Sequence, residues 1–443
     1  MYQKLLLVIF FSFSALQADY ILKVDKREKS KIDRMPKNSV ADMKRIPQNP
    51  AFYADQIKPF SKTEQLDLDK KFNEKYFKPW TLKKLDIPDK DFGWEVRFVT
   101  KSPIYREKGK LISASVYDKW IANADYDNVD SKKYKAITIK RTNIKALPTS
   151  SAFYRDPKKT GEGFPFDYNQ NSALHINIPL YISHFSKDKR WAFVRASYAF
   201  GWVKTSDLAL VNNDFMKTFK NENYAMVIKD NLRLYDDSKP LSIVKIGALF
   251  PIAEDDEHYL TASRDDKGRA HITKVKAVID QAKIIAKKPL PFTAENVAML
   301  AKEFYGEPYG WGGSYECRDC SATTRDFLGA FGIFLRRNSG KQAKDGETIN
   351  IKGLSKNTKK KKIIKDAQPF RSLLHVPGHI VLYLGEYKGE PVIMHTYWGI
   401  RKNDKTKIIT GRTIITSTEP GKERADVREK SKLINTLQTI VNF

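Results

Sequence analysis

The chain has 443 residues, which is too long for one compact core, so we expect three or four domains. Apolar residues make up 41% of it and aromatic residues 12%, which argues against wholesale disorder. The net charge of +27 suits a polyanionic partner, such as nucleic acid, anionic lipid or an acidic cell-wall polymer, but does not distinguish among them.

The N-terminus has the pattern of a secretory signal peptide. Lys4 precedes an apolar run, residues 5–13, which is too short to span a bilayer. We therefore predict a signal peptide over residues 1–18, cleaved after Ala18. The mature protein is then expected to be exported to the periplasm or cell envelope, with no stable membrane insertion and no nucleic-acid partner. Residues 19–45 are charged and are expected to be a mobile lead-in.

The next stretch, residues 46–130, is predicted to be a small helical domain. Ser61 and Glu64 have the spacing of a capping box, and the apolar residues that follow predict a helix over 62–78, ending before Pro79. A second helix is expected at 111–123. This domain shows no chemistry of its own.

From residue 134 the pattern changes to short alternating strands separated by turns of Asp, Asn, Lys and Gly. Their spacing predicts two consecutive small β-barrels, at 134–212 and 218–282. Pro289 and Pro291 mark the next boundary.

The C-terminal domain is predicted to span 290–443. A helix is expected from Thr293 to Gly306, followed by a glycine-rich turn and a second helix that begins at Cys320. Two strands are expected at 379–385 and 391–397. The basic stretch 338–370 is interpreted as a solvated loop, and residues 433–441 as an amphipathic final helix.

Cys317 and Cys320 are the only cysteines. Two are too few for a disulfide framework, and no histidine pair follows at the spacing of a zinc site. A thiolate is the reactive form of cysteine, and a helix N-terminus favours an anion. Cys320 is therefore the candidate nucleophile, with a lowered thiol pKa expected.

A nucleophile needs a base within hydrogen-bond reach and a group that orients the base. His379 and His395 fall on one face of the predicted hairpin, opposite or nearly opposite each other, whereas His375 is interpreted as a surface residue. The glycines of the turn around Trp311 either allow positive φ angles or let a substrate backbone approach closely, in which case Trp311 would line the groove.

These residues carry a resemblance to a known family. The stretches "YGWGG", "DCSATTRDFLGAFGIFLRRNSGKQ", "GHIVLYLG" and "VIMHT" look like the NlpC-type cysteine peptidases, which are papain-like bacterial cell-wall hydrolases. The resemblance is specific across about 290–420. More loosely, the flanking regions resemble a subgroup with a helical N-terminal domain and two bacterial SH3-like barrels. The implied fold is a multidomain α+β architecture with a C-terminal papain-like domain.

The resemblance implies an endopeptidase that cuts peptidoglycan stem peptides between γ-D-Glu and the diamino acid, meso-diaminopimelate. It implies Cys320 as nucleophile, His379 as general base and His395 as the third polar residue. Asp319 and Ser321 would hold the substrate's N-terminal end, and Tyr198 of the first barrel would line the groove. No metal or organic cofactor is implied, and a monomer is expected. Ala322 and Arg336 depart from the family pattern, which normally has Gly and Pro there, so loop shape and substrate preference differ.

Other interpretations stay open at this point. The protein could be a non-catalytic wall-binding protein, or an N-acetylmuramoyl-L-alanine amidase or transferase of related fold. A dithiol oxidoreductase would explain the two cysteines, but no βαβ pattern precedes them. A Cys317–Cys320 disulfide could also switch the enzyme off, although a passive Cys317 thiol is the simpler interpretation.

Overall fold

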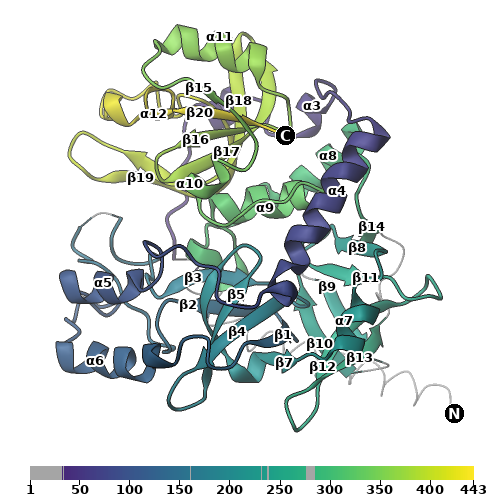
Figure 1. Ribbon diagram of the computed structural model, residues 1–443. Coiled ribbons are helices and arrows are strands. Elements are labelled where there is room, and N and C mark those ends of the chain that lie inside the picture. The colour runs from purple at the N-terminus through teal and green to yellow at the C-terminus, as the bar shows by residue number, and fades with distance from the viewer. Residues whose placement is uncertain (1–31, 33, 160, 231, 237–238, 276–284) are drawn as a thin grey trace, which may run out of the picture.

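The computed structural model describes all residues except 1–31, 33, 160, 231, 237–238 and 276–284 (Figure 1). The predicted signal peptide lies outside the described residues. Within the described part of the chain, no helix combines the length and the apolar composition needed to cross a membrane.

The N-terminal part of the chain is helical, as its sequence predicts. Its helices, with 3₁₀ turns written as η, are α2 (Asp42–Arg45), α3 (Ala51–Ala54), α4 (Lys62–Phe77), η1 (Lys78–Thr81), α5 (Trp94–Lys101), α6 (Ala114–Asn123) and η2 (Tyr126–Asn128). The helix predicted at 62–78 is α4, and the Ser61 hydroxyl accepts a hydrogen bond from the Glu64 backbone N–H at 3.1 Å. The helix predicted at 111–123 is α6, which begins three residues later than expected.

The expectation of a mobile lead-in is wrong for residues 34–45. Asp42 is buried, and one of its carboxylate oxygens accepts hydrogen bonds from the backbone N–H and the hydroxyl of Ser417, at 2.9 and 2.8 Å. The backbone N–H of Asn38 donates to the carbonyl of Ile409 at 2.7 Å. This charged stretch is ordered by its long-range partners, which its own composition does not reveal.

The N-terminal helices pack mainly on the later regions. Phe72 and Tyr76 of α4 share one hydrophobic core with residues from all the following regions. The indole N–H of Trp80 donates to the carbonyl of Ala136 at 2.8 Å, and the Tyr76 hydroxyl donates to the carbonyl of Asn177 at 3.0 Å. Residues 46–130 therefore hold the later regions together.

The first group of strands forms one seven-stranded antiparallel sheet, in the order β3-β2-β6-β5-β4-β1-β7. Its elements are β1 (Tyr134–Thr138), β2 (Thr142–Lys145), β3 (Gln170–Leu174), β4 (Pro179–Phe185), β5 (Trp191–Ala196), β6 (Phe200–Lys204), η3 (Thr205–Asp207) and β7 (Leu208–Leu210). Their range agrees with the first predicted barrel.

The second group of strands is split among three smaller sheets, in the orders β11-β8-β14, β10-β9 and β12-β13. Its elements are α7 (Asn213–Phe219), β8 (Tyr224–Val227), β9 (Leu232–Asp236), β10 (Lys239–Val244), β11 (Leu249–Pro251), β12 (Tyr259–Arg264), β13 (Ala270–Val275) and β14 (Ile285–Lys287). Strands do occur where they are expected, but a second SH3-like barrel stays a prediction.

The C-terminal region contains a six-stranded antiparallel sheet in the order β15-β20-β16-β17-β18-β19. Its elements are α8 (Ala294–Phe304), η4 (Trp311–Glu316), α9 (Cys320–Ala330), α10 (Ser339–Gln342), β15 (Glu347–Asn350), α11 (Lys356–Asp366), β16 (Leu373–Val376), β17 (His379–Tyr387), β18 (Glu390–Arg401), β19 (Lys407–Ser417), η5 (Glu429–Ser431), α12 (Leu433–Thr436) and β20 (Thr439–Asn442). The two predicted strands are β17 and β18, and both are longer than expected.

Two expectations for this region are wrong. The basic stretch 338–370 contains α10, β15 and α11, and Lys359 is buried because its ammonium group donates to three carbonyls at the end of α12. The predicted final helix is only the short α12, since Ile440 and Val441 pair with β15 and β16 in the sheet.

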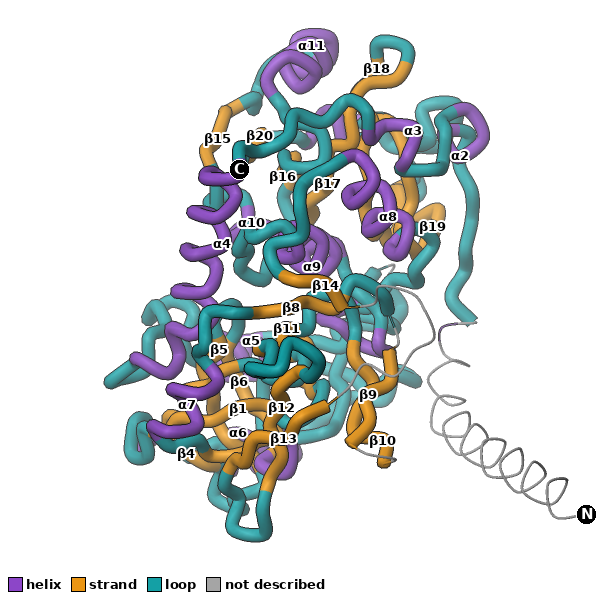
Figure 2. The backbone as a smooth tube through the Cα atoms, turned by 90° about the vertical axis from the view of Figure 1, so that its right-hand side faces the viewer, coloured by secondary structure: helices purple, strands orange, loops and turns teal. Residues whose placement is uncertain are grey.

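The described chain is arranged in two lobes (Figure 1). The C-terminal sheet and its helices form one lobe, and the two groups of strands form the other. Helix α9 lies where the lobes meet, and α4 runs from one lobe to the other (Figures 1 and 2). Cys320, at the first residue of α9, is therefore positioned by contacts from both lobes.

Candidate active site

Cys320 is the first residue of α9, as predicted. The helix starts there because the carboxylate of Asp319, its N-cap, accepts a hydrogen bond from the backbone N–H of Ala322 at 2.9 Å. Helix α9 packs against β17 and β18. The backbone N–H of Ile380, the residue that follows His379, acts to lower the pKa of the Cys320 thiol. The contacts therefore bring the sulfur to the end of the strand that carries His379.

The glycine-rich turn before α9 requires glycine at two positions. Gly312 and Gly313 have φ angles of +59° and +85°, which confirms the first of the two interpretations. A Cβ on Gly312 would collide with the carbonyl oxygen of Gln170. The same turn therefore lies directly against β3 of the first sheet, while close approach of a substrate stays a prediction.

The carboxylate of Asp319 is fully occupied by internal partners. Arg337 binds it in bidentate fashion, with both N–O distances at 2.7 Å, and Gly312 donates its backbone N–H at 3.1 Å. The Ser321 hydroxyl donates to Asp319 at 3.1 Å and also contacts Arg337. These bonds fix the start of α9. Contact of Asp319 and Ser321 with a substrate stays a prediction.

His379 and His395 meet on one face of the β17–β18 hairpin, as expected. His379 Nε2 lies 3.0 Å from His395 Nδ1. The register Leu382↔Met394 puts His395 two residues away from the position opposite His379, so the rings meet diagonally rather than directly across. A β-bulge between Tyr383 and Gly385 shifts the register, which sequence spacing could not show.

A third residue settles which nitrogen of each ring carries a proton. The Thr416 hydroxyl donates its single hydrogen to the carbonyl of Ser417 at 2.8 Å, so it must accept from His395 Nε2–H, 3.1 Å away. His395 Nδ1 is then the acceptor for the Nε2–H of His379. This series of hydrogen bonds leaves a lone pair on Nδ1 of His379, which is the arrangement that a general base needs.

Burial keeps both imidazoles neutral. It lowers the pKa of His379 to about 4, against the opposing effect of the Asp319 carboxylate. It also holds the pKa of His395 well below its ordinary value, with a smaller contribution from His379 in the same direction. Tyr397 stacks on His395, with ring centroids 4.6 Å apart, and its ring centroid lies 5.1 Å from that of His379. It therefore contacts both imidazole rings.

The expectation of a lowered thiol pKa at Cys320 is wrong for this unliganded site. Burial, followed by the negative charge of Asp319, raises the pKa of the Cys320 thiol to about 12. Backbone N–H groups and Arg337 act in the opposite direction but contribute less. The site therefore rests as a neutral thiol beside a neutral imidazole, and the proton must move when the sulfur attacks.

Cys317 is buried and its thiol donates to the carbonyl of Tyr315 at 3.2 Å. Burial raises its pKa to about 12. Both cysteines are free, so the structure gives no support to a disulfide.

Trp311 belongs to an aromatic group that joins the two lobes. Its ring contacts Phe166 and Tyr168 of the first β region, with centroids 5.1 and 5.7 Å apart. Phe166 also contacts Trp398 of β18 at 5.3 Å. Trp311 is thus an interlobe packing residue here, and its role in a groove stays a prediction.

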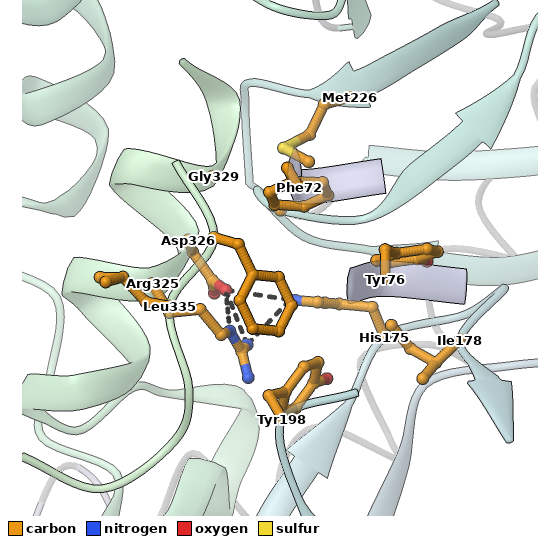
Figure 3. A pocket seen from close by; sticks show the side chains of 12 residues that line it. Phe72, Tyr76, His175, Ile178, Tyr198, Met226, Arg325, Asp326, Gly329 and Leu335 are labelled. Atoms are coloured by element: carbon orange, nitrogen blue, oxygen red, sulfur yellow. Dashed lines mark hydrogen bonds and ion pairs between the residues drawn. The ribbon is translucent and has the colours of Figure 1, made fainter. Parts of the chain in front are cut away.

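The role of Tyr198 as a groove residue stays a prediction. Its side chain is buried and lines a pocket together with His175, Arg325 and Asp326 (Figure 3). The guanidinium of Arg325 lies 4.2 Å from the centre of the Tyr198 ring. None of the three candidate catalytic residues lines this pocket, so the structure gives no support to Tyr198 as a groove residue.

Two departures from the family pattern have structural consequences. Arg336 uses the backbone N–H that proline would lack, donating it to Asp345 at 2.9 Å, while its guanidinium pairs with the same carboxylate at 2.6 Å. Ala322 adds a buried methyl group in the first turn of α9, while its backbone N–H donates the N-cap hydrogen bond to Asp319 as that of a glycine would. Both residues stabilise the segment around α9.

Sequence reasoning missed Thr416, Tyr397 and Arg337. Thr416 lies on β19, a strand that was not predicted, and Tyr397 is the last residue of the predicted hairpin strand, to which no role was assigned. Arg337 was within the quoted family stretch, and its position 18 residues after Asp319 gave no sign of the ion pair. Among the described residues, no group of three or more His, Cys, Asp or Glu side chains could hold a metal ion.

Three family models match the chain. Residues 306–407 match the NlpC/P60 family, residues 6–128 match the NLPC_P60 stabilising domain, N term, and residues 152–204 match an SH3 domain of the SH3b1 type. Together these matches cover more than half of the chain. A search of curated proteins gave no match.

The fold is shared with a solved structure described as a novel NlpC/P60 endopeptidase from Photobacterium damselae subsp. piscicida. The two share 22% sequence identity with a TM-score of 0.81, over 92% of this chain and 98% of that chain. An NlpC/P60 family protein from Bacillus cereus ATCC 10987 matches with 16% identity and a TM-score of 0.46, over 70% of this chain and 99% of that chain. The chain thus combines an NlpC/P60 domain at residues 306–407 with the N-terminal stabilising domain of such proteins and an SH3 domain, and it is a cysteine peptidase.

Proposed function

We propose that this protein is an exported cysteine endopeptidase that hydrolyses the bond between γ-D-Glu and meso-diaminopimelate in peptidoglycan stem peptides. Cys320 is the nucleophile, His379 the general base and His395 the residue that orients the base. The observation that carries the proposal is the hydrogen-bond chain from Thr416 through His395 to His379, which leaves one lone pair on His379, a residue of the strand β17 that packs against α9. The reaction assigned to these residues uses no metal or organic cofactor.

The first half of the reaction forms an acyl-enzyme. The Cys320 thiol gives its proton to Nδ1 of His379 as the sulfur attacks the γ-D-glutamyl carbonyl carbon. The backbone N–H of Cys320, in the first turn of α9, has no acceptor within the helix and can donate to the oxyanion, a contribution of about 3 kcal/mol. The tetrahedral intermediate expels the amine of the diamino acid, which takes the proton from His379.

The second half restores the enzyme. A water molecule gives a proton to Nδ1 of His379 and attacks the thioester carbonyl. Collapse of this intermediate releases the γ-D-glutamyl acid, and the sulfur takes the proton back from His379. Because burial lowers the pKa of His379 to about 4, its imidazole is neutral at neutral pH before the reaction starts, and it is protonated only while it carries the proton between sulfur, amine and water.

The cell-wall substrate and the location are part of this proposal. The matches to NlpC/P60 and SH3 family models support a peptidoglycan substrate, and the net charge of +27 suits an anionic polymer. The N-terminal sequence supports export to the periplasm or cell envelope. We further propose that residues 218–282 are a second SH3-like barrel and that the protein acts as a monomer.

The proposal is tested with L-Ala-γ-D-Glu-meso-diaminopimelate as substrate and Cys320→Ala as the variant. We expect the wild type to release L-Ala-γ-D-Glu and free diaminopimelate, and the variant to have no measurable turnover while its circular dichroism is unchanged. Turnover by Cys320→Ala would contradict the assignment. Digestion of whole sacculi distinguishes this endopeptidase from an amidase, because an amidase would release the complete stem peptide from the sugar.

A further inference from the structure

A buried group of charged side chains lies between the second group of strands and the start of α9. We call it the Arg318 cluster, and its members are Asp230, Lys245, Glu307, Arg318, Arg325 and Asp326. It contains three cations and three anions, so its formal charge is balanced. Arg318, Lys245 and Asp326 are each less than 5% exposed.

Arg318 is the centre of the cluster, and its guanidinium uses all three of its nitrogen atoms. Nη1 and Nη2 bind the carboxylate of Asp230 at 2.7 and 2.8 Å, and Nη1 also binds Glu307 at 3.0 Å. Nε donates to Asp326 at 2.7 Å, and Nη2 donates to the carbonyl of Ile246 at 3.1 Å. A planar guanidinium with this many fixed partners has one allowed position.

Two segments of the second group of strands supply these contacts. Asp230 follows β8, and residues 245–247 precede β11. Lys245 pairs with Asp230 at 3.0 Å, and the backbone N–H of Ile246 donates to Asp230 at 2.9 Å. At Gly247, whose φ is +94°, a Cβ would lie 2.9 Å from Oδ1 of Asp326. The backbone of this region therefore lies directly against α9.

The position of Arg318 constrains the position of the nucleophile, because the two residues are separated by a single residue. Arg318 immediately precedes Asp319, the N-cap of α9, and Cys320 follows. The carbonyl of Arg318 also accepts a hydrogen bond from the backbone N–H of Gly310 at 2.8 Å, so its peptide is held as well as its side chain. A shift of Arg318 would therefore move Cys320 relative to His379, which is carried by a different element.

We propose that Asp230 is a positioning residue for catalysis and that the region 218–282 acts through Arg318 to hold the sulfur of Cys320 in reach of His379. The inference rests on the proposed function only in taking Cys320 as the nucleophile. It gives the second group of strands a role in the reaction, although none of its described residues is among the candidate catalytic residues.

The test uses Asp230→Asn in the full-length chain, which removes one negative charge at nearly constant shape. Asp255→Asn is the matched control, because Asp255 is exposed in the same region and its partners Lys274, His258 and the backbone N–H of Glu257 all lie outside the Arg318 cluster. Kinetics on the tripeptide substrate are normalised to folded protein. We expect Asp230→Asn to lower kcat about tenfold or more with KM within twofold of the wild type, and Asp255→Asn to change neither.

A second readout does not need the substrate. Iodoacetamide alkylates accessible thiols, and tryptic cleavage after Arg318 places Cys317 and Cys320 on different peptides, so mass spectrometry follows each rate separately. We expect the alkylation rate of Cys320 to change at least threefold in Asp230→Asn and to stay at the wild-type value in Asp255→Asn. If Asp230→Asn changes the Cys320 alkylation rate in this way but the wild type does not cleave the tripeptide, the proposed function fails and the positioning role stands.

A double variant separates positioning from a simple loss of stability. Asp230→Asn with Lys245→Gln removes one charge of each sign, so it restores the charge balance of the cluster. We expect it to recover at least half of the lost kcat and to return the Cys320 alkylation rate toward the wild type. Unchanged kcat and alkylation in Asp230→Asn would overturn the proposal. Failure of both variants to fold would also overturn it, since the cluster would then serve folding alone.

Discussion

Two histidines near helix α9 differ in what their nitrogens can do. His379 is half-buried on β17, a strand that packs against α9, while the buried His175 contacts Asp326 and Arg325 of α9 itself (Figure 3). Burial lowers the pKa of each to about 4. A depressed pKa therefore does not by itself identify the catalytic histidine.

The hydrogen bonds make the distinction. His379 gives its one N–H to His395 and keeps a lone pair for the sulfur. At His175 the Nε2 atom lies 3.2 Å from Arg325 Nη2, which can only donate, and 3.3 Å from Asp326 Oδ1, which can only accept, while its Nδ1 is buried with no hydrogen-bond partner among the described residues. The neutral chain of Thr416, His395 and His379 leaves a lone pair on His379 that can act as a base. At His175 the cation Arg325 lies against Nε2 instead. The predictions below test this contrast.

The largest expected effect is at His379. Replacing it with alanine removes the group that accepts the thiol proton and protonates the leaving amine. We expect kcat to fall by about a thousandfold, within the usual range for loss of a general acid–base residue. Steady-state kinetics on the tripeptide checks this, with His375→Ala on the neighbouring strand as the control expected to retain activity.

A smaller effect is expected at Thr416. Thr416→Val removes the acceptor for His395 Nε2–H, so the proton on His395 can move to Nδ1 and compete with the bond from His379. We expect kcat to fall about tenfold with little change in KM, as for other residues that orient a functional imidazole. Thr410→Val is the control, because it removes a buried hydroxyl from the same strand without contact to either histidine. Equal losses in both variants would contradict the role of Thr416.

The smallest effect on activity is expected at His175. We expect His175→Gln to keep kcat within about twofold and to cost about 1 kcal/mol of stability at pH 7 through the lost contacts with Asp326 and Arg325. The variant has a more specific effect on how the stability of the native state depends on pH. The pKa of His175 falls from 6.5 to about 4 on folding, so below pH 6.5 the unfolded chain binds a proton that the native chain excludes.

Native stability is therefore expected to fall as the pH drops from about 6.5 toward 4, with His379 acting in the same direction. His175→Gln should make this loss shallower, which thermal midpoints at pH 7, 6 and 5 will measure. A steeper loss in the variant than in the wild type would show that His175 binds its proton in the native state.

Local patterns in the sequence were enough to predict the parts of the site that depend on neighbouring residues. Cys320 begins a helix because Asp319 can cap it, and alternation puts His379 and His395 on one hairpin face. Both features need only a few consecutive residues. The first group of strands was predicted for the same reason, from its period of two.

Long-range contacts decided what the sequence could not show. Thr416 reaches His395 from a strand 21 residues away, and the register depends on a bulge near Gly385. The basic stretch 338–370 was interpreted as a solvated loop, yet Lys359 within it is buried, with its ammonium group donating to carbonyls at the end of α12. The pKa of the Cys320 thiol also depends on its surroundings in the fold. Burial and the negative charge of Asp319 raise it by more than the backbone N–H groups at the helix N-terminus lower it.

The central claim is that neutral His379, with its lone pair on Nδ1, is held by His395 and Thr416 beside a neutral thiol. The most direct test is nitrogen NMR of ¹⁵N-histidine-labelled protein at pH 7, with His379→Gln and His395→Gln to assign the two rings. We predict that both rings are neutral and protonated on Nε2 alone. A doubly protonated His379 at that pH, or a proton on Nδ1 of either ring, would contradict the account.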